Sequence, residues 1–391
     1  MLNLPNHLEE EILSMIPFSS MRAVRLTCKK WNTLFKSRSF TTMHIGKQEA
    51  EAERESGESR MVVMTDHNVC LTSVVTVNEH EKPSTKPLGK LTCLDNEHVK
   101  ISQVFHCDGL LLCVLKDDIT RFVVWNPYLG QTRWIEARYF HRMNKYKYAI
   151  GYEDRKSCRS YKILRFRDDS DYYVHYPYNK NHLSLYDSYD FESNLWRTHY
   201  LRDPLTLAFC DRGVSLKGNT YWCATNGLGE ISHTVCFDFA SESFGGIKDL
   251  PFSVPFDDKE RVALSCVRDE KLSVLVQSMQ TSVIDIWITD NIEEEKVLWS
   301  KFLRVDLGPL NGLRISNGCF FIDEEKKVVM VINKDRKERL DTLKIFGKDG
   351  FSELELGEPS DKKCWPVMCS YVPSLVQVKL PEGGTRNRQR D

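Results

Sequence analysis

Few residues in this chain have the types and spacing that catalysis or metal binding requires. Its thirteen cysteines and eleven histidines are scattered over 391 residues, without a Cys-x-x-Cys pair or a Cys/His cluster at zinc-ligand spacing. The sequence also lacks a Gly-x-Ser-x-Gly nucleophile turn, a glycine-rich phosphate loop and a His-Glu-x-x-His zinc helix. We therefore predict no catalytic residue, no bound metal and no cofactor.

One acidic run has part of the pattern of a calcium-binding loop. Asp168, Asp169 and Asp171 are closely spaced, but the run lacks the glycine at the turn and the closing glutamate. These residues therefore favour a solvated loop.

The segment 168–189 is the part of the chain most suited to recognising another molecule. It contains six tyrosines and two histidines in an otherwise polar stretch. Exposed tyrosine offers a large contact area at low entropic cost. The hypothesis is a recognition loop, and the alternative is a long hairpin whose tyrosines lie against a sheet edge. The residues assigned to substrate binding on the first hypothesis are Tyr172, Tyr173, Tyr176 and Tyr178.

Residues 4–40 predict three short amphipathic helices. Pro5 is suited to the first turn of a helix, and Pro17 ends the pattern. Apolar residues between them recur at helical spacing and form one stripe: Leu8, Ile12, Met15 and Ile16. About forty residues are too few to bury these side chains alone, so the helices require another surface.

The second and third helices are marked by capping residues. Ser19 and Ser20 are predicted to cap the second helix. Thr27 is predicted to cap the third, in which Cys28, Trp31 and Phe35 share one face. A DNA-binding helix-turn-helix needs an exposed row of Arg, Gln or Asn, which the third helix lacks. We therefore predict a protein partner and no nucleic acid.

From residue 61 to about 380 the sequence changes to short strands separated by polar turns. A strand, polar turn and aromatic residue recur every 50 to 60 residues, as in 124–134, 189–196 and 237–244. This period is near the size of a four-stranded propeller blade. Six blades are favoured, seven remain open, and a β-sandwich is the alternative fold.

Two polar segments flank this β-rich region. Residues 46–60 are strongly charged and predict either a flexible linker or a solvated helical extension. Residues 381–391 predict a flexible basic tail, for which solubility is favoured over a nuclear signal.

Composition narrows the environment of the protein. The formal net charge is −1, which gives no overall field for nucleic acid or anionic lipid. No apolar run approaches the ~20 residues of a membrane span, and no signal-peptide pattern opens the sequence. With its scattered, odd number of cysteines, the chain is expected in a reducing compartment, the cytoplasm and/or the nucleus, without membrane association.

The helical stretch resembles the F-box domain. The resemblance lies in Leu4-Pro5, the helix with Leu8 and 11–13, Ile16-Pro17, and the run 24–31. His7 departs from the family, which usually has an acidic residue there. The positions that the resemblance implies as contacts to a Skp-type adaptor are Leu4, Pro5, Leu8, Ile12, Leu13, Ile16, Val24, Cys28, Lys29 and Trp31.

The β-rich region resembles the F-box-associated domain of the large plant F-box family. Its features include 109–113, Val-Trp-Asn-Pro at 124–127, Gly-Asn-Thr-Tyr-Trp at 218–222 and the ending 369–376. The resulting fold class is α+β and multidomain: a three-helix F-box (1–45), a bridge (46–60), an all-β propeller-like domain (61–380) and a tail (381–391). These strand and turn residues identify a scaffold and leave its ligand open.

Together the resemblances imply the substrate-recognition subunit of a Skp–cullin–F-box ubiquitin ligase. Its F-box would dock on the adaptor, and through it a cullin, while the propeller would hold an unidentified target protein without performing chemistry. One alternative is an adaptor-bound scaffold without a degradation target. Another is a propeller enzyme or sugar-binding module.

Overall fold

A computed structural model of the chain gives the fold described below. It describes residues 5–17, 20–35, 37, 39–40, 43–47, 58–75, 84–90, 99–137, 145–155, 159–168, 183–205, 212–226, 228–256, 260–268, 270–278, 280–292, 297–306, 315–334, 340–347 and 350–378. Among these residues, none of the helices combines the length and apolarity that crossing a membrane demands.

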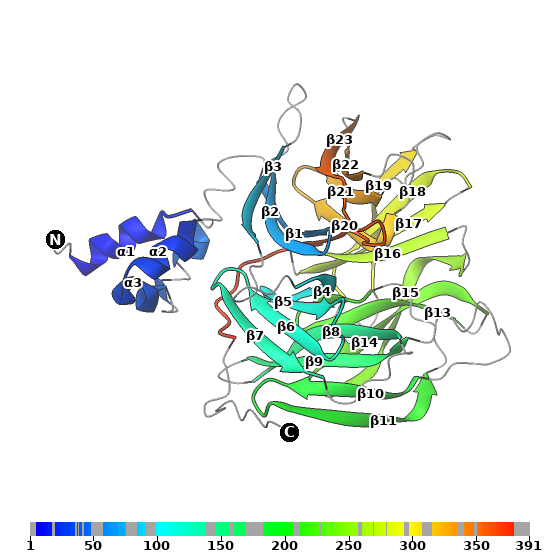
Figure 1. Cartoon of the computed structure of the whole chain (residues 1–391). Coiled ribbons are helices and arrows are strands. Elements are labelled where there is room, and N and C mark those ends of the chain that lie inside the picture. The colour runs from blue at the N-terminus through cyan, green and yellow to red at the C-terminus, as the bar shows by residue number, and fades with distance from the viewer. Residues whose placement is uncertain are drawn as a thin grey trace.

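Three helices form a small module beside a much larger β-structure (Figure 1). They are α1 (Asn6–Ser14), α2 (Met21–Thr27) and α3 (Lys29–Leu34). Pro5 is the N-cap of α1, as its fixed φ and lack of a backbone N–H favour. Ser20 holds the N-cap position of α2 without a side-chain capping bond. The predicted cap of α3 was wrong: Cys28, not Thr27, occupies that position and accepts a hydrogen bond from the Trp31 N–H.

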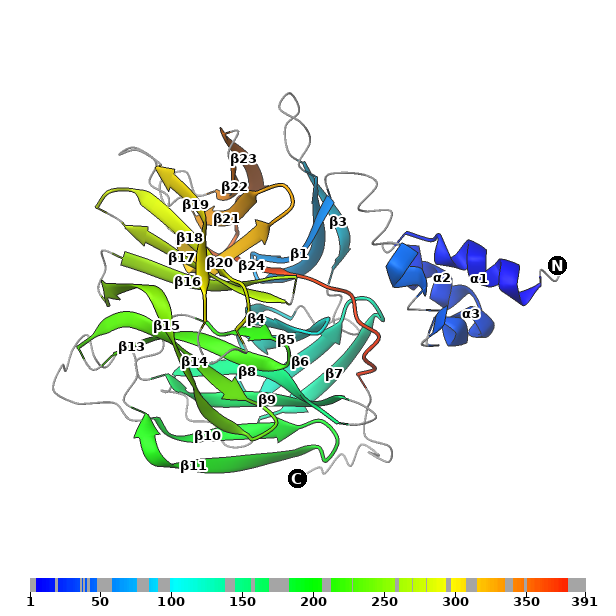
Figure 2. The ribbon, with the colours of Figure 1, turned by 180° about the vertical axis from the view of Figure 1, so that it is seen from behind.

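Within the described residues, the strands form six four-stranded antiparallel sheets arranged around a common centre (Figures 1 and 2). Blade 1 combines β24 (Val367–Ser370), β1 (Glu58–Thr65), β2 (Asn68–Val75) and β3 (Ser84–Lys90). Blade 2 contains β4 (Ile101–Cys107), β5 (Leu110–Leu115), β6 (Arg121–Asn126) and β7 (Gln131–Glu136). Blade 3 contains β8 (Lys145–Asp154), β9 (Arg159–Asp168), β10 (Leu183–Asp190) and β11 (Leu195–Leu205).

The remaining three blades follow in chain order. Blade 4 contains β12 (Val214–Leu216), β13 (Asn219–Thr225), β14 (Glu230–Asp238) and β15 (Ser243–Pro255). Blade 5 contains β16 (Glu260–Val267), β17 (Lys271–Ser278), β18 (Val283–Thr289) and β19 (Trp299–Asp306). Blade 6 contains β20 (Ile315–Asp323), β21 (Val328–Lys334), β22 (Asp341–Gly347) and β23 (Gly350–Gly357). The fold is a six-bladed β-propeller, as favoured from the repeat, and the seven-blade and sandwich alternatives are wrong.

The ring is closed by strands from the two ends of the β-rich region. β24 pairs antiparallel with β1, from Met61 opposite Ser370 to Met64 opposite Val367. The first blade is therefore completed by the last strand, which the repeat alone had not indicated. β1 also begins at Glu58, inside the segment predicted as a bridge.

The apolar core lies between neighbouring blades. One cluster joins blades 2 and 3, another joins blades 3 and 4, and two more join blades 4 with 5 and 5 with 6. The largest spans blades 1, 2 and 6 and continues into the helical module. Every residue of β5 is buried, because both of its sides pack against other strands or blades.

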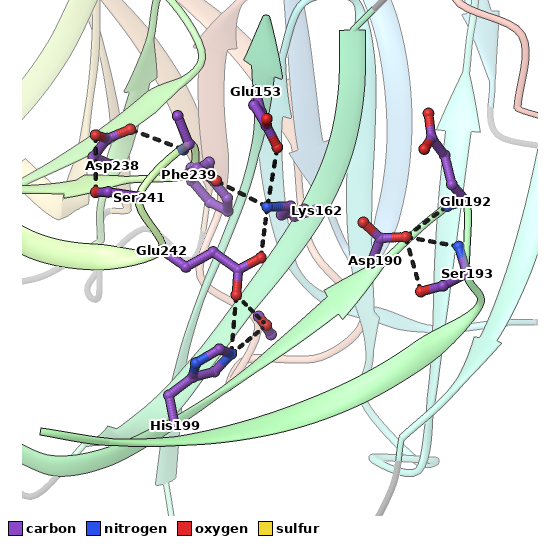
Figure 3. A network of polar contacts seen from close by, with 12 residues as sticks. Glu153, Lys162, Asp190, Glu192, Ser193, His199, Asp238, Phe239, Ser241 and Glu242 are labelled. Carbon is purple, nitrogen blue, oxygen red and sulfur yellow. Dashed lines mark hydrogen bonds and ion pairs between the residues drawn. The ribbon is translucent and has the colours of Figure 1, made fainter. Parts of the chain in front are cut away.

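The repeated Asp-Phe-x-Ser sequence forms the turn between the third and fourth strands of two blades. In blade 3, Asp190 Oδ1 accepts hydrogen bonds from the N–H groups of Glu192 (3.0 Å) and Ser193 (2.7 Å) (Figure 3). In blade 4, Asp238 accepts hydrogen bonds from the N–H of Ala240 and the hydroxyl of Ser241. Although burial acts in the opposite direction, these donors lower the pKa of Asp190. The motif therefore forms a turn, which explains why it recurs at the same place in blades 3 and 4.

Candidate functional site

Two large apolar side chains of α1 and that of its C-cap residue, Met15, are exposed to water in one row. Leu8 is 38% exposed, Ile12 53% and Met15 58%. Spacings of four and three residues place them on one face of a helix, one above the other. Complete removal of such a side chain from water is worth about 1.5–3 kcal/mol. We call these three residues the α1 row; contiguous exposed apolar surface of this kind marks a protein contact.

The opposite side of α1 packs inside the module. Leu13 is 3% exposed and belongs to a cluster with Met21, Phe35 and Phe40. The rings of Phe35 and Phe40 meet edge to face, with centroids 4.9 Å apart. α1 therefore has two apolar sides, of which one packs inside the module and the other is exposed to solvent.

The start of α3 lies next to α1 and is fixed by polar contacts. The Cys28 Sγ accepts the capping bond from the Trp31 N–H at 3.4 Å. Lys30 Nζ lies 2.5 Å from Glu9 Oε2, which connects α3 to the first turn of α1. These contacts hold the half-buried Trp31 in a fixed position.

The predicted adaptor contacts occupy different positions in the module. Those exposed to solvent are Pro5, Leu8, Ile12, Cys28 and Lys29. Those half-buried are Ile16, Val24 and Trp31. Leu13 is buried, so its side chain offers no surface to a partner in this structure, and Leu4 lies outside the described residues. Met15 was missing from the predicted contacts, although its helical spacing to Leu8 and Ile12 was the signal that could have added it.

The helical module is attached to the propeller through His44. Its Nε2 lies 2.9 Å from the carbonyl oxygen of Ile16, and its Nδ1 lies 2.9 Å from the hydroxyl of Tyr128. Because a carbonyl only accepts, Nε2 carries the ring proton and the Tyr128 hydroxyl donates to Nδ1. Burial and the charge of Arg60 lower the pKa of His44, against an opposing effect of the bond to Ile16. Neutral pH therefore favours the neutral ring that this geometry requires.

The turn between β6 and β7 receives the module and is itself held by the C-terminal segment. Arg25 of α2 donates to the carbonyl of Leu129 in this turn. Asn126 Nδ2 donates to the carbonyls of Ser374 (3.1 Å) and Val376 (2.8 Å). The Tyr128 N–H also donates to the Tyr371 hydroxyl at 3.2 Å. The Val-Trp-Asn-Pro motif and the ending 369–376, far apart in sequence, thus form one support for the helices.

A buried ion-pair network joins blades 3 and 4 (Figure 3). The side chain of Lys162 on β9 is 6% exposed, and its Nζ lies 2.5 Å from Glu242 Oε1 and 3.4 Å from Glu153 Oε2. It also donates to the carbonyl of Phe239 at 3.1 Å. Removing one member of a buried pair costs about 3–5 kcal/mol, because its partner stays buried and charged. The network therefore ties the two blades together.

The same network contains a serine, a histidine and a glutamate without the geometry of a catalytic triad. His199 Nε2 lies 2.8 Å from Ser188 Oγ and 3.0 Å from Glu242 Oε2 (Figure 3). A triad requires the serine on Nε2, which takes the serine proton, and the acid on Nδ1, where it orients the ring and stabilises its charged form. Here both groups compete for one nitrogen, while the ring stacks on Tyr186 at 4.9 Å. These contacts therefore hold blades 3 and 4 together.

The predicted substrate-binding tyrosines lie outside the described residues: Tyr172, Tyr173, Tyr176 and Tyr178. Tyr186 and Tyr189 of the same tyrosine-rich segment are described, and both are buried. Within the described part of the chain, no group of three or more His, Cys, Asp or Glu side chains has an arrangement that could hold a metal ion.

Comparison with protein families assigns both parts of the molecule. Residues 1–43 match the F-box domain, and residues 60–378 match the F-box associated beta propeller domain. The chain belongs to the F-box proteins with an F-box-associated β-propeller. Its helical module is thus the F-box, and the support formed by Asn126 and the C-terminal segment lies within the F-box-associated propeller.

Curated relatives from Arabidopsis thaliana extend over nearly the whole chain. A putative F-box protein is 50% identical over 97% of this chain and 91% of its own length. An F-box/kelch-repeat protein is 47% identical over 99% of this chain and 92% of its own length. A protein named Peroxiredoxin-2A is 47% identical over 100% of this chain and 71% of its own length. The chain therefore spans most of the length of each of these relatives.

A more distant likeness is found among solved structures. The fucose-specific lectin from Aleuria aurantia aligns with 78% of this chain and 98% of its own, at 10% identity and a TM-score of 0.39. A likeness at this level carries no argument for sugar binding by the present propeller.

Proposed function

We propose that this F-box protein is the substrate-recognition subunit of a Skp–cullin–F-box ubiquitin ligase. The F-box docks on a Skp-type adaptor and through it a cullin, and the propeller binds the protein to be ubiquitinated. The observation that carries the proposal is the α1 row, in which Leu8, Ile12 and Met15 lie exposed together. The family membership supports the same role, because the F-box implies an adaptor.

The α1 row suits a partner that supplies an apolar groove. An amphipathic helix commonly binds by laying residues i, i+4 and i+7 into such a groove, and the row has this spacing. Trp31, half-buried at the edge of the module, adds an aromatic anchor of the type that dominates binding energies.

The attachment through His44 supports a receptor role for the whole chain. The bonds of His44 to Tyr128, and of Arg25 to Leu129, connect the F-box directly to blade 2. A target held on the propeller would then be kept at a defined position relative to the adaptor. Such positioning raises the effective concentration of the target at an enzyme elsewhere in the complex, so the receptor needs no catalytic group of its own.

The cysteines support the expected compartments. Cys113 and Cys223 are buried in strands, where they serve as small apolar side chains. This usage fits the cytoplasm and/or the nucleus, where thiols are kept reduced.

The proposal is tested by co-expressing the full chain with a Skp-type adaptor, followed by affinity purification and size exclusion. We expect a stoichiometric complex that is lost when Ile12→Asp is combined with Met15→Asp, and strongly weakened by Trp31→Ala. Leu195→Asp is the matched control, because Leu195 on β11 is 58% exposed, as Met15 is. A soluble chain that ignores the adaptor, or equal losses in the control, would refute the assignment.

The ubiquitin-ligase role needs a second measurement. A protein captured by the propeller should be longer-lived in cells when the Ile12→Asp/Met15→Asp chain replaces the normal one. An adaptor complex whose captured protein has the same lifetime in both cases would instead support a scaffold.

A further inference from the structure

Inner strands from several blades meet near the centre of the propeller (Figure 2). Residues on them line a small cavity, which we call the hub cavity. Its walls are formed by β4, β16, β20, β24 and the start of β12, and its volume is about 40 Å³. The polar or charged side chains of its lining come from His106, Arg212, Ser215, Ser265 and Ser370, with cysteines and apolar residues between them. None of the described residues that line it is acidic, so Arg212 gives the cavity a positive charge.

Arg212 is half-buried at the wall of the cavity. Its Nη1 lies 3.3 Å from Cys319 Sγ, a weak and uncharged acceptor. The guanidinium carbon lies 4.9 Å from the centre of the Phe105 ring. No acidic partner of Arg212 occurs among the residues that the structure describes. Most of its five N–H donors are therefore available to a ligand.

Another buried arginine of the propeller has the carboxylate partner that a buried positive charge usually has. Arg165 on β9 has its Nη2 2.6 Å and its Nε 3.1 Å from Asp187 Oδ2, so its charge is compensated inside the protein. Partial burial of a guanidinium without such a partner is unfavourable. Among the described residues Arg212 has no such compensation, which leaves its guanidinium suited to bind an anion.

His106 supplies a second donor at the cavity wall. Its Nε2 accepts a hydrogen bond from the Gly109 N–H at 3.1 Å, so the ring proton resides on Nδ1. Among the described residues, no acceptor is found for this N–H. The cavity thus combines a guanidinium and a ring N–H, and both groups donate.

The volume of the cavity limits what can enter. A bound water needs roughly 10–15 Å³, so a cavity of about 40 Å³ holds about three atoms the size of a water oxygen. A carboxylate has three heavy atoms, and its two oxygens match the fork of a guanidinium. A tetrahedral phosphate is larger.

We propose that the hub cavity binds a carboxylate group, held by Arg212 and His106. The carboxylate belongs either to a small organic acid or to the free end of a protein chain, and the chemistry of recognition is the same. The site does not depend on adaptor docking, because it is formed entirely by the propeller.

The test measures thermal unfolding of the full chain while chloride is replaced by acetate at constant ionic strength. We expect the midpoint temperature of unfolding to rise with acetate concentration and then to level off, as for a ligand that binds only the folded state. Inorganic phosphate should give a smaller rise. An equal rise with phosphate, or the same midpoint in acetate and chloride, would overturn the proposal.

Variants of Arg212 separate binding from a general salt effect. Arg212→Gln should abolish the acetate response, and Arg212→Lys should weaken acetate binding at least tenfold, because an ammonium lacks the planar fork. Arg268→Gln is the matched control, since Arg268 is exposed and already paired with Glu325. If Arg212→Gln does not fold, the acetate response of Arg212→Lys, compared with that of the unchanged chain, tests the proposal instead. An unchanged response in the Arg212 variants would contradict the assignment.

The two sources of the carboxylate are distinguished with a tripeptide of alanine. If the free acid stabilises the chain at lower concentration than acetate, and the C-terminal amide does not, the ligand is the end of a protein chain. If only acetate acts, the ligand is a small acid. Adaptor co-purification is a separate measurement, so failure of this site leaves the proposed ligase role unaffected.

Discussion

The α1 row and the hub cavity are two candidate binding surfaces built in opposite ways. The row comes from one helix, with its members spaced by four and three residues. The cavity collects His106, Arg212 and Ser370 from strands and connections distant in sequence. The row therefore exists wherever α1 is folded, whereas the cavity exists only when the propeller ring is closed. Substitutions in one region should therefore alter the surface in that region and leave the other surface unaffected.

The largest expected effect comes from Gly109→Ala, next to the hub. Gly109 has φ 72°, and a Cβ there would lie 2.3 Å from Ser374 Cβ and 2.9 Å from the Val372 carbonyl oxygen. Left-handed strain and overpacking together should lower the free energy of unfolding by about 3–5 kcal/mol. Chemical denaturation measures this loss, and the acetate response should disappear while adaptor binding remains.

Gly130→Ala is the matched control for that substitution. Gly130 also has a positive φ, 60°, but a Cβ there would meet nothing within 4 Å. Only the backbone strain remains, so the expected loss is about 1 kcal/mol. Equal losses in the two variants would contradict the close approach of the C-terminal segment to Gly109.

A second pair of changes divides the two sides of α1. Leu13→Ala should destabilise the F-box by about 2–4 kcal/mol, because it leaves a cavity beside Phe35 and Phe40. Ile12→Ala, one residue away, should change stability by less than about 1 kcal/mol and yet weaken adaptor binding at least tenfold. Chemical denaturation measures the change in stability, and titration with the adaptor measures the change in affinity. The reverse pattern would mean that the helix faces are assigned the wrong way round.

A pH-dependent effect of moderate size should be confined to the propeller. Burial raises the pKa of Asp341 on β22 to about 6, with Asp66 adding to the rise and Lys334 opposing it. The folded chain then binds more protons than the unfolded chain between about pH 4 and 6, so stability falls as pH rises through this window. Asp341→Asn should therefore stabilise the protein by on the order of 2 kcal/mol above pH 6.

The control is to compare the stability of the unchanged chain and of Asp341→Asn at lower pH. The gain from Asp341→Asn should shrink toward zero as the pH falls below about 4, where the carboxyl becomes protonated in both states. Thermal unfolding at a series of pH values gives the comparison. A gain independent of pH would show that the charge of Asp341 is not its cause.

The smallest expected effect concerns the connection between the two regions. His44→Phe keeps a ring of similar size against Phe40 but removes the hydrogen bonds to Ile16 and Tyr128. The expected cost is about 1–2 kcal/mol, with adaptor binding retained. Small-angle scattering should show a wider range of F-box positions relative to the propeller. Tyr128→Phe, which removes one hydroxyl, should give part of this change; an unaltered profile in both would argue against the attachment.

The local parts of this molecule could be predicted from its sequence. The helix stripe with Leu8 and Ile12, the strand repeat and the turns at Asp190 and Asp238 depend on residues close in the chain. Periodicity reports such features directly. The family resemblance added the assignment of both domains, which the family matches confirm.

The remaining features depend on contacts between distant residues. Nothing local indicates that Leu13 packs inward while Ile12 faces outward, or that β24 completes the first blade. Arg212 has the sequence context of any loop arginine, and its lack of a carboxylate partner among the described residues emerges only after several blades meet. The adaptor contacts and the tyrosines of 172–178 stay predictions.

The pairing of β24 with β1 sets an order of events during synthesis. A ribosome completes the F-box long before it reaches Val367, so the α1 row is available to an adaptor on the nascent chain. The ring, by contrast, stays open until Ser370 has left the exit tunnel and the last strand pairs with the first blade. Under the proposed function, a premature stop upstream of β24 would yield a chain that still occupies the adaptor but has no closed propeller, and such a fragment would compete with the full-length chain for the adaptor.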